Sequence, residues 1–151
     1  MPSFPTVIST VLGSSVAVTL CDRKRNTGGM NHFLFPSAGP DDKATAIYGN
    51  VAVVTLIRMM LDNGSPPGDL EAQIFGGAYN PGVSPRDVGR DNLMLARLAL
   101  KQRGIRVVSE DVGGNLGRKV IYDTAQCEIV TLKVELLRDS DWYPYEDDLL
   151  R

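Results

Sequence analysis

Two side chains near the N-terminus could act together as a nucleophile and a base. Ser15 follows Gly13-Ser14 in a run of small residues, and His32 is the only histidine of the chain. An imidazole that takes the proton of a hydroxyl or thiol makes it a nucleophile able to attack a carbonyl carbon. Each residue also has an ordinary alternative, because serine beside glycine is common in turns and a single histidine is often a core residue.

Three segments with the composition of β-strands surround this pair. They are rich in β-branched and apolar residues and run over Thr6–Leu12, Val16–Cys21 and Met30–Phe35. We expect Asp22–Gly29, which is charged and then glycine-rich, to be a loop. Ser15 would then lie where a loop enters a buried strand, and His32 would lie on the next strand.

The rest of the chain predicts two main helices and four further strands. Helical spacing of apolar residues runs from about Lys43 or Ala44 to Asn63, and again from about Val88 to Arg103. The predicted strands are Leu70–Phe75, Ile105–Val108, Lys119–Tyr122 and Cys127–Leu137. Because strands outnumber helices and do not alternate with them regularly, we expect an α+β fold in which mixed β-sheets form a layered sandwich and two helices pack against it. Residues 1–151 would form a single domain, with Asp139–Arg151 a loosely held acidic tail.

Composition excludes several classes of function. The 16 Lys and Arg residues against 18 Asp and Glu residues give a net charge of −2, and no basic stripe predicts nucleic-acid binding. No uncharged apolar run reaches the roughly 18 residues of a membrane span. The apolar segment Thr6–Cys21 has no positive residue before it, so we do not interpret it as a signal peptide. These features predict a cytoplasmic protein without membrane insertion.

No pattern in the chain predicts a metal or a cofactor. Cys21 and Cys127 are too few for a disulfide framework and lack metal-ligand spacing, so we expect reduced thiols. A phosphate cradle needs a strand before its glycine loop and a helix after it, whereas a strand follows Gly113–Gly117. We therefore expect a tight turn there, with Arg118 exposed or paired with a carboxylate.

Five motifs in the chain follow a known family in order and spacing. They are Leu12-Gly13-Ser14-x-Val16-Ala17-Val18, Gly29-Met30-Asn31-His32-Phe33, Tyr48-Gly49, Phe75-Gly76-Gly77-Ala78 and Asp111-x-Gly113-Gly114-x-x-Gly117-Arg118. Over nearly its whole length the chain resembles the chemoreceptor glutamine deamidase family (CheD). The resemblance implies hydrolysis of glutamine side-chain amides on the cytoplasmic helices of methyl-accepting chemotaxis receptors, which leaves glutamate and ammonia.

The same resemblance implies a role for each residue of the pair. The family's nucleophile is a cysteine at the position of Ser15, and its base is the histidine that corresponds to His32. A threonine that helps to orient this histidine corresponds to Ser9, with Thr10 beside it. Relatives also bind a CheC-type phosphatase, so both this phosphatase and the receptors are expected partners.

Ser15 is the main departure from the family. A cysteine thiol ionises near pH ~8.5, whereas an alcohol is far less acidic, so a site shaped for sulfur would deprotonate Ser15 poorly. Cys21 cannot replace it, because six residues of extended strand separate the two by about 20 Å. We therefore expect the chain as written to be inactive or very slow. Ser15 is either a Cys→Ser replacement made to trap a complex or a natural residue.

Two alternatives to the deamidase remain open from the residues. A natural Ser15 favours a non-catalytic adaptor that binds receptor helices or the CheC phosphatase. Direct use of Ser15 with His32 would instead give a serine hydrolase.

Overall fold

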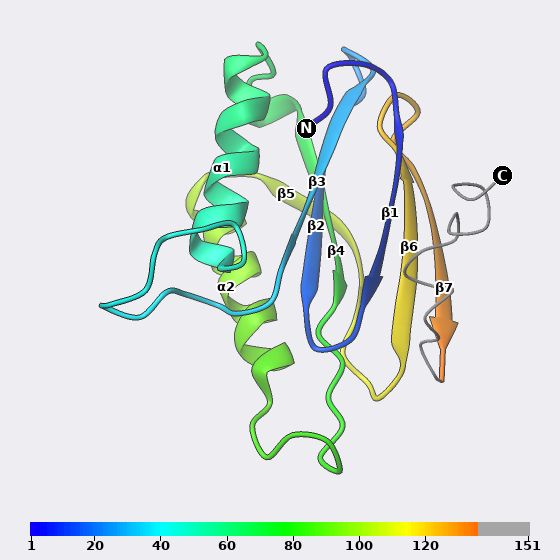
Figure 1. The fold of residues 1–151 in the computed structure, drawn as a ribbon. Helices are drawn as coiled ribbons and strands as arrows, with labels where there is room; N and C mark the ends of the chain where they lie inside the picture. The colour runs from blue at the N-terminus through cyan, green and yellow to red at the C-terminus, as the bar shows by residue number, and fades with distance from the viewer. Residues whose placement is uncertain (136–151) are drawn as a thin grey trace, which may run out of the picture.

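Two β-sheets stacked face to face, with two helices on one side, make up residues 1–135, the part of the chain that the computed structural model describes (Figure 1). The strands are β1 Val7–Leu12, β2 Val16–Asp22, β3 Thr27–Phe33, β4 Leu70–Gly76, β5 Arg106–Val112, β6 Gly117–Asp123 and β7 Glu128–Val134. The helices are α1 Gly49–Asp62 and α2 Val88–Gln102, with a short 3-10 turn at Pro67–Asp69. The acidic tail predicted at Asp139–Arg151 lies outside the described residues.

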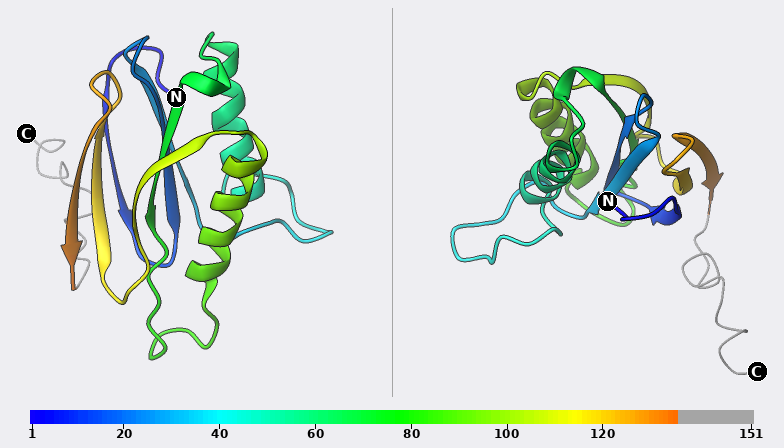
Figure 2. Two further views of the ribbon diagram at one scale, coloured as in Figure 1. Left: turned by 180° about the vertical axis from the view of Figure 1, so that it is seen from behind. Right: turned by 90° about the horizontal axis from the view of Figure 1, so that it is seen from above.

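The first sheet is mixed and has the strand order β3-β2-β4-β5, and the second is antiparallel with the order β1-β6-β7. Within the first sheet only the β4–β5 pair is parallel. The view from above shows three layers, with the helices outside the four-stranded sheet and the three-stranded sheet on its other face (Figure 2). This arrangement confirms the predicted α+β sandwich. In the described part of the chain, no helix has the length and apolar character to cross a membrane.

Strand β2 is the centre of the core, and every one of its residues is buried. Val16, Val18 and Leu20 pack into the cluster that lies under the helices. Ala17 faces the other way, into the cluster between the sheets that includes Val120 of β6. Burial of a large aliphatic side chain stabilises the fold by about 1.5–3 kcal/mol, so both faces of β2 hold the layers together.

Strand β3 begins at Thr27, three residues before the predicted start, and includes two glycines that we expected in a loop. A side chain at Gly28 would collide with the hydroxyl of Tyr122, and one at Gly29 would meet Leu56. The Tyr122 hydroxyl donates a hydrogen bond of 3.0 Å to the Leu20 carbonyl and so occupies this space. The glycines are therefore required by packing between the layers, which the sequence does not reveal.

Helix α1 begins at Gly49, five or six residues later than the sequence predicts. The Ile47 carbonyl accepts hydrogen bonds from the backbone N–H groups of Leu34 and Phe35, at 2.8 and 3.1 Å. The Gly49 N–H in turn donates to the Phe35 carbonyl at 2.8 Å. The segment before α1 is thus held alongside the chain that leaves β3, and tertiary pairing overrides its helical spacing.

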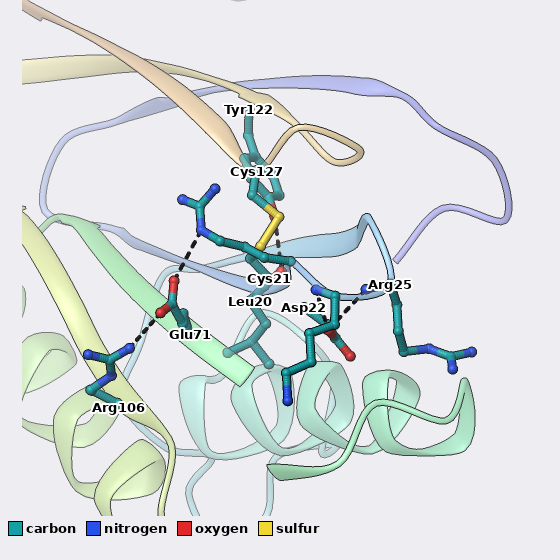
Figure 3. Close-up of polar contacts among 10 residues, drawn as sticks. Leu20, Cys21, Asp22, Arg25, Glu71, Arg106, Tyr122 and Cys127 are labelled. Atoms are coloured by element: carbon teal, nitrogen blue, oxygen red, sulfur yellow. Dashed lines mark hydrogen bonds and ion pairs between the residues drawn. A yellow bond between two sulfur atoms is a disulfide. The ribbon is translucent and has the colours of Figure 1, made fainter. Parts of the chain in front are cut away.

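The expectation of reduced thiols is wrong for this structure, because Cys21 and Cys127 form a disulfide with a Cα–Cα distance of 5.8 Å. The turn between β6 and β7 brings Cys127 over the last residues of β2, beside Tyr122 (Figure 3). The 106 residues that separate the two cysteines in sequence conceal this proximity. The bond joins the two sheets covalently at one end of the sandwich.

We expect reduction of this disulfide to destabilise the protein by about 2–4 kcal/mol, because the bond closes a long loop and so restricts the unfolded chain. Urea unfolding with and without dithiothreitol measures the difference. The double variant Cys21→Ser/Cys127→Ser is the control, and its unfolding should not respond to the reductant. Equal unfolding midpoints for the oxidised and reduced wild-type chain would contradict the assignment.

Candidate active site

The loop Gly13–Ser15 carries the chain from one sheet to the other, and each of its three carbonyl groups accepts a hydrogen bond. The Gly13 carbonyl accepts from Ala78 N at 2.9 Å, the Ser14 carbonyl from Asn92 Nδ2 at 3.1 Å, and the Ser15 carbonyl from Gly77 N at 2.8 Å. The backbone N–H groups of Ser14 and Ser15 donate no hydrogen bond within the described part of the chain. The loop is therefore fixed through its acceptors while its donors stay free.

Two consecutive glycines allow the neighbouring loop to come this close. Gly76 and Gly77 have φ angles of +99° and +66°, which residues with a side chain rarely adopt. A Cβ atom at Gly76 would collide with the Ser15 carbonyl oxygen, and one at Gly77 would lie 2.7 Å from Leu93. The Phe75-Gly76-Gly77-Ala78 motif thus serves to hold the Ser15 loop.

A third loop joins these two. Gly113 N donates to the Gly76 carbonyl at 2.9 Å, and Tyr79 N donates to the Gly114 carbonyl at 2.8 Å. Both glycines of this turn have positive φ, as the tight-turn prediction requires. Three of the sequence motifs therefore meet at one end of the sandwich.

Arg118 stabilises the glycine turn, and all three of its guanidinium nitrogens donate hydrogen bonds within it. The side chain is buried and lies 3.0 Å from the Asp111 carboxylate. It also donates to the carbonyls of Leu116 and Gly113, at 3.1 and 2.9 Å. Of the two sequence-based alternatives, the structure supports the carboxylate-paired arginine.

His32 lies on β3 opposite Ala17 of β2, on the face that points toward the second sheet. Its Nδ1 atom is 3.0 Å from the hydroxyl of Thr10 on β1. Both β1 and β3 are edge strands, so this hydrogen bond links the edges of the two sheets. The other ring nitrogen, Nε2, is buried and has no hydrogen-bond partner among residues 1–135.

The prediction that Ser9 contacts His32 is wrong, because the hydroxyl at the histidine is that of Thr10. Successive side chains of a strand point to opposite faces. Thr10 pairs with Val120, which lies in the core between the sheets, whereas Ser9 pairs with Ile121 and is exposed. Strand alternation therefore brings the hydroxyl of Thr10, and not that of Ser9, to His32.

Ser15 directly precedes β2 and lies two residues before Ala17, which pairs with His32 of β3. The register of β2 and β3 therefore brings position 15 to the end of the strand pair near His32. No hydrogen bond joins Ser15 to His32 in the structure, and Ser15 is 8% exposed. Catalytic hydrogen bonds are often long without substrate and shorten when it binds.

Two surface clefts flank the start of α2, next to this arrangement. The first has a volume of about 370 Å³ and is bordered by Gly13, Ser14 and the 78–88 loop. The second, of about 470 Å³, lies between Phe35 and the start of α2. Arg86 and Val88 border both clefts. Neither Ser15 nor His32 lines them, and Gly13 and Ser14, which directly precede Ser15, form one wall of the first cleft.

Burial lowers the pKa of His32 below its ordinary value of 6.5. No carboxylate contributes to this shift, and the cause is loss of solvent around the charged form. The imidazole is therefore neutral at pH 7, the state in which Nε2 can accept a proton. Among residues 1–135 no cluster of three or more metal-ligating side chains occurs.

Sequence reasoning missed the contacts that Asn92 and Thr10 make with the proposed catalytic segments. Asn92 looks like an ordinary polar residue of α2, and only its full burial distinguishes it. Thr10 could have been found from the alternation that puts it on the same face as Leu12. That signal was ambiguous because both faces of β1 carry apolar residues.

Comparison with known proteins places this geometry in context. Residues 34–133 match the family model described as CheD chemotactic sensory transduction. The chain is 41% identical over 123 residues to the probable chemoreceptor glutamine deamidase CheD of Sulfurimonas denitrificans, which covers 80% of this chain and 79% of that protein. It is 37% identical over 147 residues to the protein of the same name from Herminiimonas arsenicoxydans, with 94% and 72% covered. The corresponding protein of Trichlorobacter lovleyi is 41% identical over 119 residues, 78% and 74% of the two chains.

We expect the imidazole of His32 to titrate below pH 6.5 in the folded protein. Because the chain has one histidine, its ring proton signals in an NMR titration report this pKa directly. The lowered pKa also affects stability. Because the pKa of His32 is lower in the folded chain, the unfolded chain takes up a proton at a higher pH, so His32 destabilises the fold as pH falls below about 6.5. His32→Gln should lose this part of the pH dependence in urea unfolding. A folded-state pKa at or above 6.5 would contradict the buried, uncompensated imidazole.

Proposed function

The chain belongs to the CheD family, and we propose that its site is that of a protein-glutamine deamidase acting on methyl-accepting chemotaxis receptors. The observation that carries the proposal is the state of His32, a neutral imidazole whose Nε2 is buried and unpartnered among residues 1–135. His32 pairs with Ala17, two residues after position 15. The names of the relatives supply the substrate class, a glutamine side chain of a chemoreceptor.

The proposed reaction begins at residue 15. With a thiol there, Nε2 of His32 takes the proton, the sulfur bonds to the amide carbon, and the carbonyl electron pair moves to the oxygen. When this intermediate collapses, the imidazolium gives its proton to the leaving nitrogen, which departs as ammonia. Water then hydrolyses the thioester and leaves glutamate. Nδ1–H of His32 would donate to Thr10 throughout, which holds the ring in the required tautomer.

Backbone groups of the fixed loop would stabilise the oxyanion. The N–H groups of Ser14 and Ser15 have no acceptor within residues 1–135, and their peptide planes are held through the carbonyls. Preorganised donors of this kind stabilise charge without reorganising during the reaction. No metal or cofactor is needed for this chemistry.

Ser15 makes the chain as written a poor catalyst in this proposal. A neutral imidazole with a lowered pKa is a weak base toward an alcohol, and no hydrogen bond joins it to Ser15. The same two facts argue against a serine hydrolase.

The clefts beside the site suit a helical protein substrate. Exposed apolar side chains surround them, with Val83 at 82% and Phe35 at 46% exposed. We propose that receptor helices bind along this face in the cytoplasm, with a glutamine side chain directed past the Gly13-Ser14 wall. A CheC-type phosphatase would use the same face. Ser15 also favours a second function, an adaptor that binds these partners without chemistry.

We expect Ser15→Cys to release ammonia from receptor cytoplasmic fragments at least about 10³-fold faster than the chain as written, the scale on which loss of a nucleophile acts. Coupled ammonia detection, with mass spectrometry of the glutamine-to-glutamate change, measures the rate. Ser15→Cys/His32→Gln is the matched control and should be inactive. A folded Ser15→Cys protein that binds the fragment without deamidating it would support the adaptor instead.

In the Ser15→Cys background, Thr10→Val should lower kcat roughly 10- to 100-fold, part of the 10²–10⁴ that a positioned base contributes. The valine keeps the shape of threonine but cannot accept from Nδ1–H. Ser9→Ala is the comparison and should change kcat less than about twofold, because Ser9 is exposed on the other face. The reverse ranking would show that Ser9 orients the histidine.

A further inference from the structure

Asn92 is a fully buried residue of α2 whose side-chain amide joins the two segments that carry the proposed catalytic pair. Its Nδ2 group donates to the Ser14 carbonyl at 3.1 Å and to the Leu34 carbonyl at 2.9 Å. Ser14 directly precedes the nucleophile position, and Leu34 follows His32 by two residues. The two acceptors define the orientation of the amide, since only its NH₂ group can pair with carbonyls.

The Ser14 carbonyl and the Ser15 N–H belong to one peptide plane. In a trans peptide these two groups point in opposite directions, and rotation of one rotates the other. The Asn92 hydrogen bond to the carbonyl therefore sets the direction of the Ser15 N–H. That N–H has no acceptor among residues 1–135 and lies at the nucleophile itself, where a developing oxyanion would form.

The oxygen end of the Asn92 side-chain amide indicates that an asparagine at this position lowers the stability of the fold. Its Oδ1 atom is buried and has no hydrogen-bond partner among the described residues. A buried acceptor without a partner destabilises the fold, and native structures contain few of them. An apolar side chain would avoid this cost but would leave the Ser14 and Leu34 carbonyls without their donor.

From these contacts we propose that Asn92 is a positioning residue, which orients the residue-15 N–H as an oxyanion donor by holding the Ser14 carbonyl. The inference rests on the proposed deamidase function. In this proposal Asn92 stabilises the tetrahedral intermediate and does not change the nucleophilicity of residue 15. The two effects can be separated, because alkylation by iodoacetamide places no oxygen atom at the oxyanion position, whereas the tetrahedral thiohemiacetal formed with an aldehyde does.

Butanal is a suitable probe because it resembles a glutamine side chain with hydrogen in place of the amide nitrogen. With the Ser15→Cys protein, the sulfur bonds to the aldehyde carbon, and the thiol proton ends on the oxygen of the thiohemiacetal. Carbon-13 NMR with labelled butanal gives the dissociation constant of this adduct. The reaction requires no receptor, so it is independent of substrate recognition.

In the Ser15→Cys background, Asn92→Ala and Asn92→Asp should each weaken the adduct about tenfold, which is less than the roughly 10²–10³ that loss of an oxyanion donor costs because the thiohemiacetal oxygen is protonated. An aspartate side chain has nearly the shape of asparagine, but its carboxylate oxygens cannot donate to the two carbonyls. The rate of iodoacetamide alkylation should stay within about twofold of the parent. With receptor fragments, kcat should fall and KM should stay nearly constant.

Leu100→Ala is the matched control for a loss of helix packing. Leu100 is fully buried in α2, about two helical turns beyond Asn92, and its side chain makes no polar contact with either catalytic segment. The substitution should lower the melting temperature while leaving the aldehyde adduct unchanged. An equal loss of aldehyde binding and alkylation rate in the Asn92 variants would overturn the proposal, as would an unchanged adduct.

A second measurement needs no Asn92 variant, and therefore covers the case in which the variants do not fold. In the Ser15→Cys protein, the backbone amide proton of residue 15 should move downfield when the butanal adduct forms, as expected for a new hydrogen bond to oxygen. An unmoved signal would overturn the proposal. If the deamidase function is wrong, the Ser15→Cys protein will release no ammonia from receptor fragments, although its aldehyde adduct still depends on Asn92. That result differs from each result that would overturn the role of Asn92.

Discussion

The constraint on which the site depends is the crossing of the chain from one sheet to the other at Gly13–Ser15. Three consecutive carbonyls of this loop accept hydrogen bonds from two different elements, the Gly77-Ala78 loop and helix α2. Once these acceptors are held, the N–H groups of the loop have fixed directions and remain free of acceptors within residues 1–135. The close approach requires glycine at positions 76 and 77, so the nucleophile loop and the glycine motif form one structural unit.

The two ends of β2 have different roles. At one end the Cys21–Cys127 disulfide and the Tyr122 hydroxyl fasten β2 to the β6–β7 hairpin. At the other end no disulfide joins the layers within residues 1–135; the backbone crosses between the sheets at Gly13–Ser15, and the Thr10–His32 hydrogen bond links the sheet edges. Both cysteines are buried, which slows the attack of a reductant on the disulfide.

Much of this arrangement follows from the sequence. The apolar run of β2, the spacing of α2 and the glycine turn at 113–114 are local signals, and the structure has these elements at the predicted places. Contacts between distant segments are not local signals. The disulfide, the late start of α1, the place of Gly28 under Tyr122 and the two bonds of Asn92 all depend on packing between layers. The sequence does not distinguish Thr10 from Ser9 as the partner of the histidine, because β1 carries apolar residues on both faces and its orientation is undetermined until β6 is in place.

The central claim is that residue 15 and His32 act as a pair although no hydrogen bond joins them in the chain as written. It is tested most directly by titrating the single imidazole by NMR in the Ser15→Cys protein, before and after the thiol is blocked with methyl methanethiosulfonate. A thiolate beside the ring favours the imidazolium, so the pKa of His32 should rise relative to the Ser15 chain and fall again when the thiol is blocked. Identical titration curves for the three proteins would contradict the account.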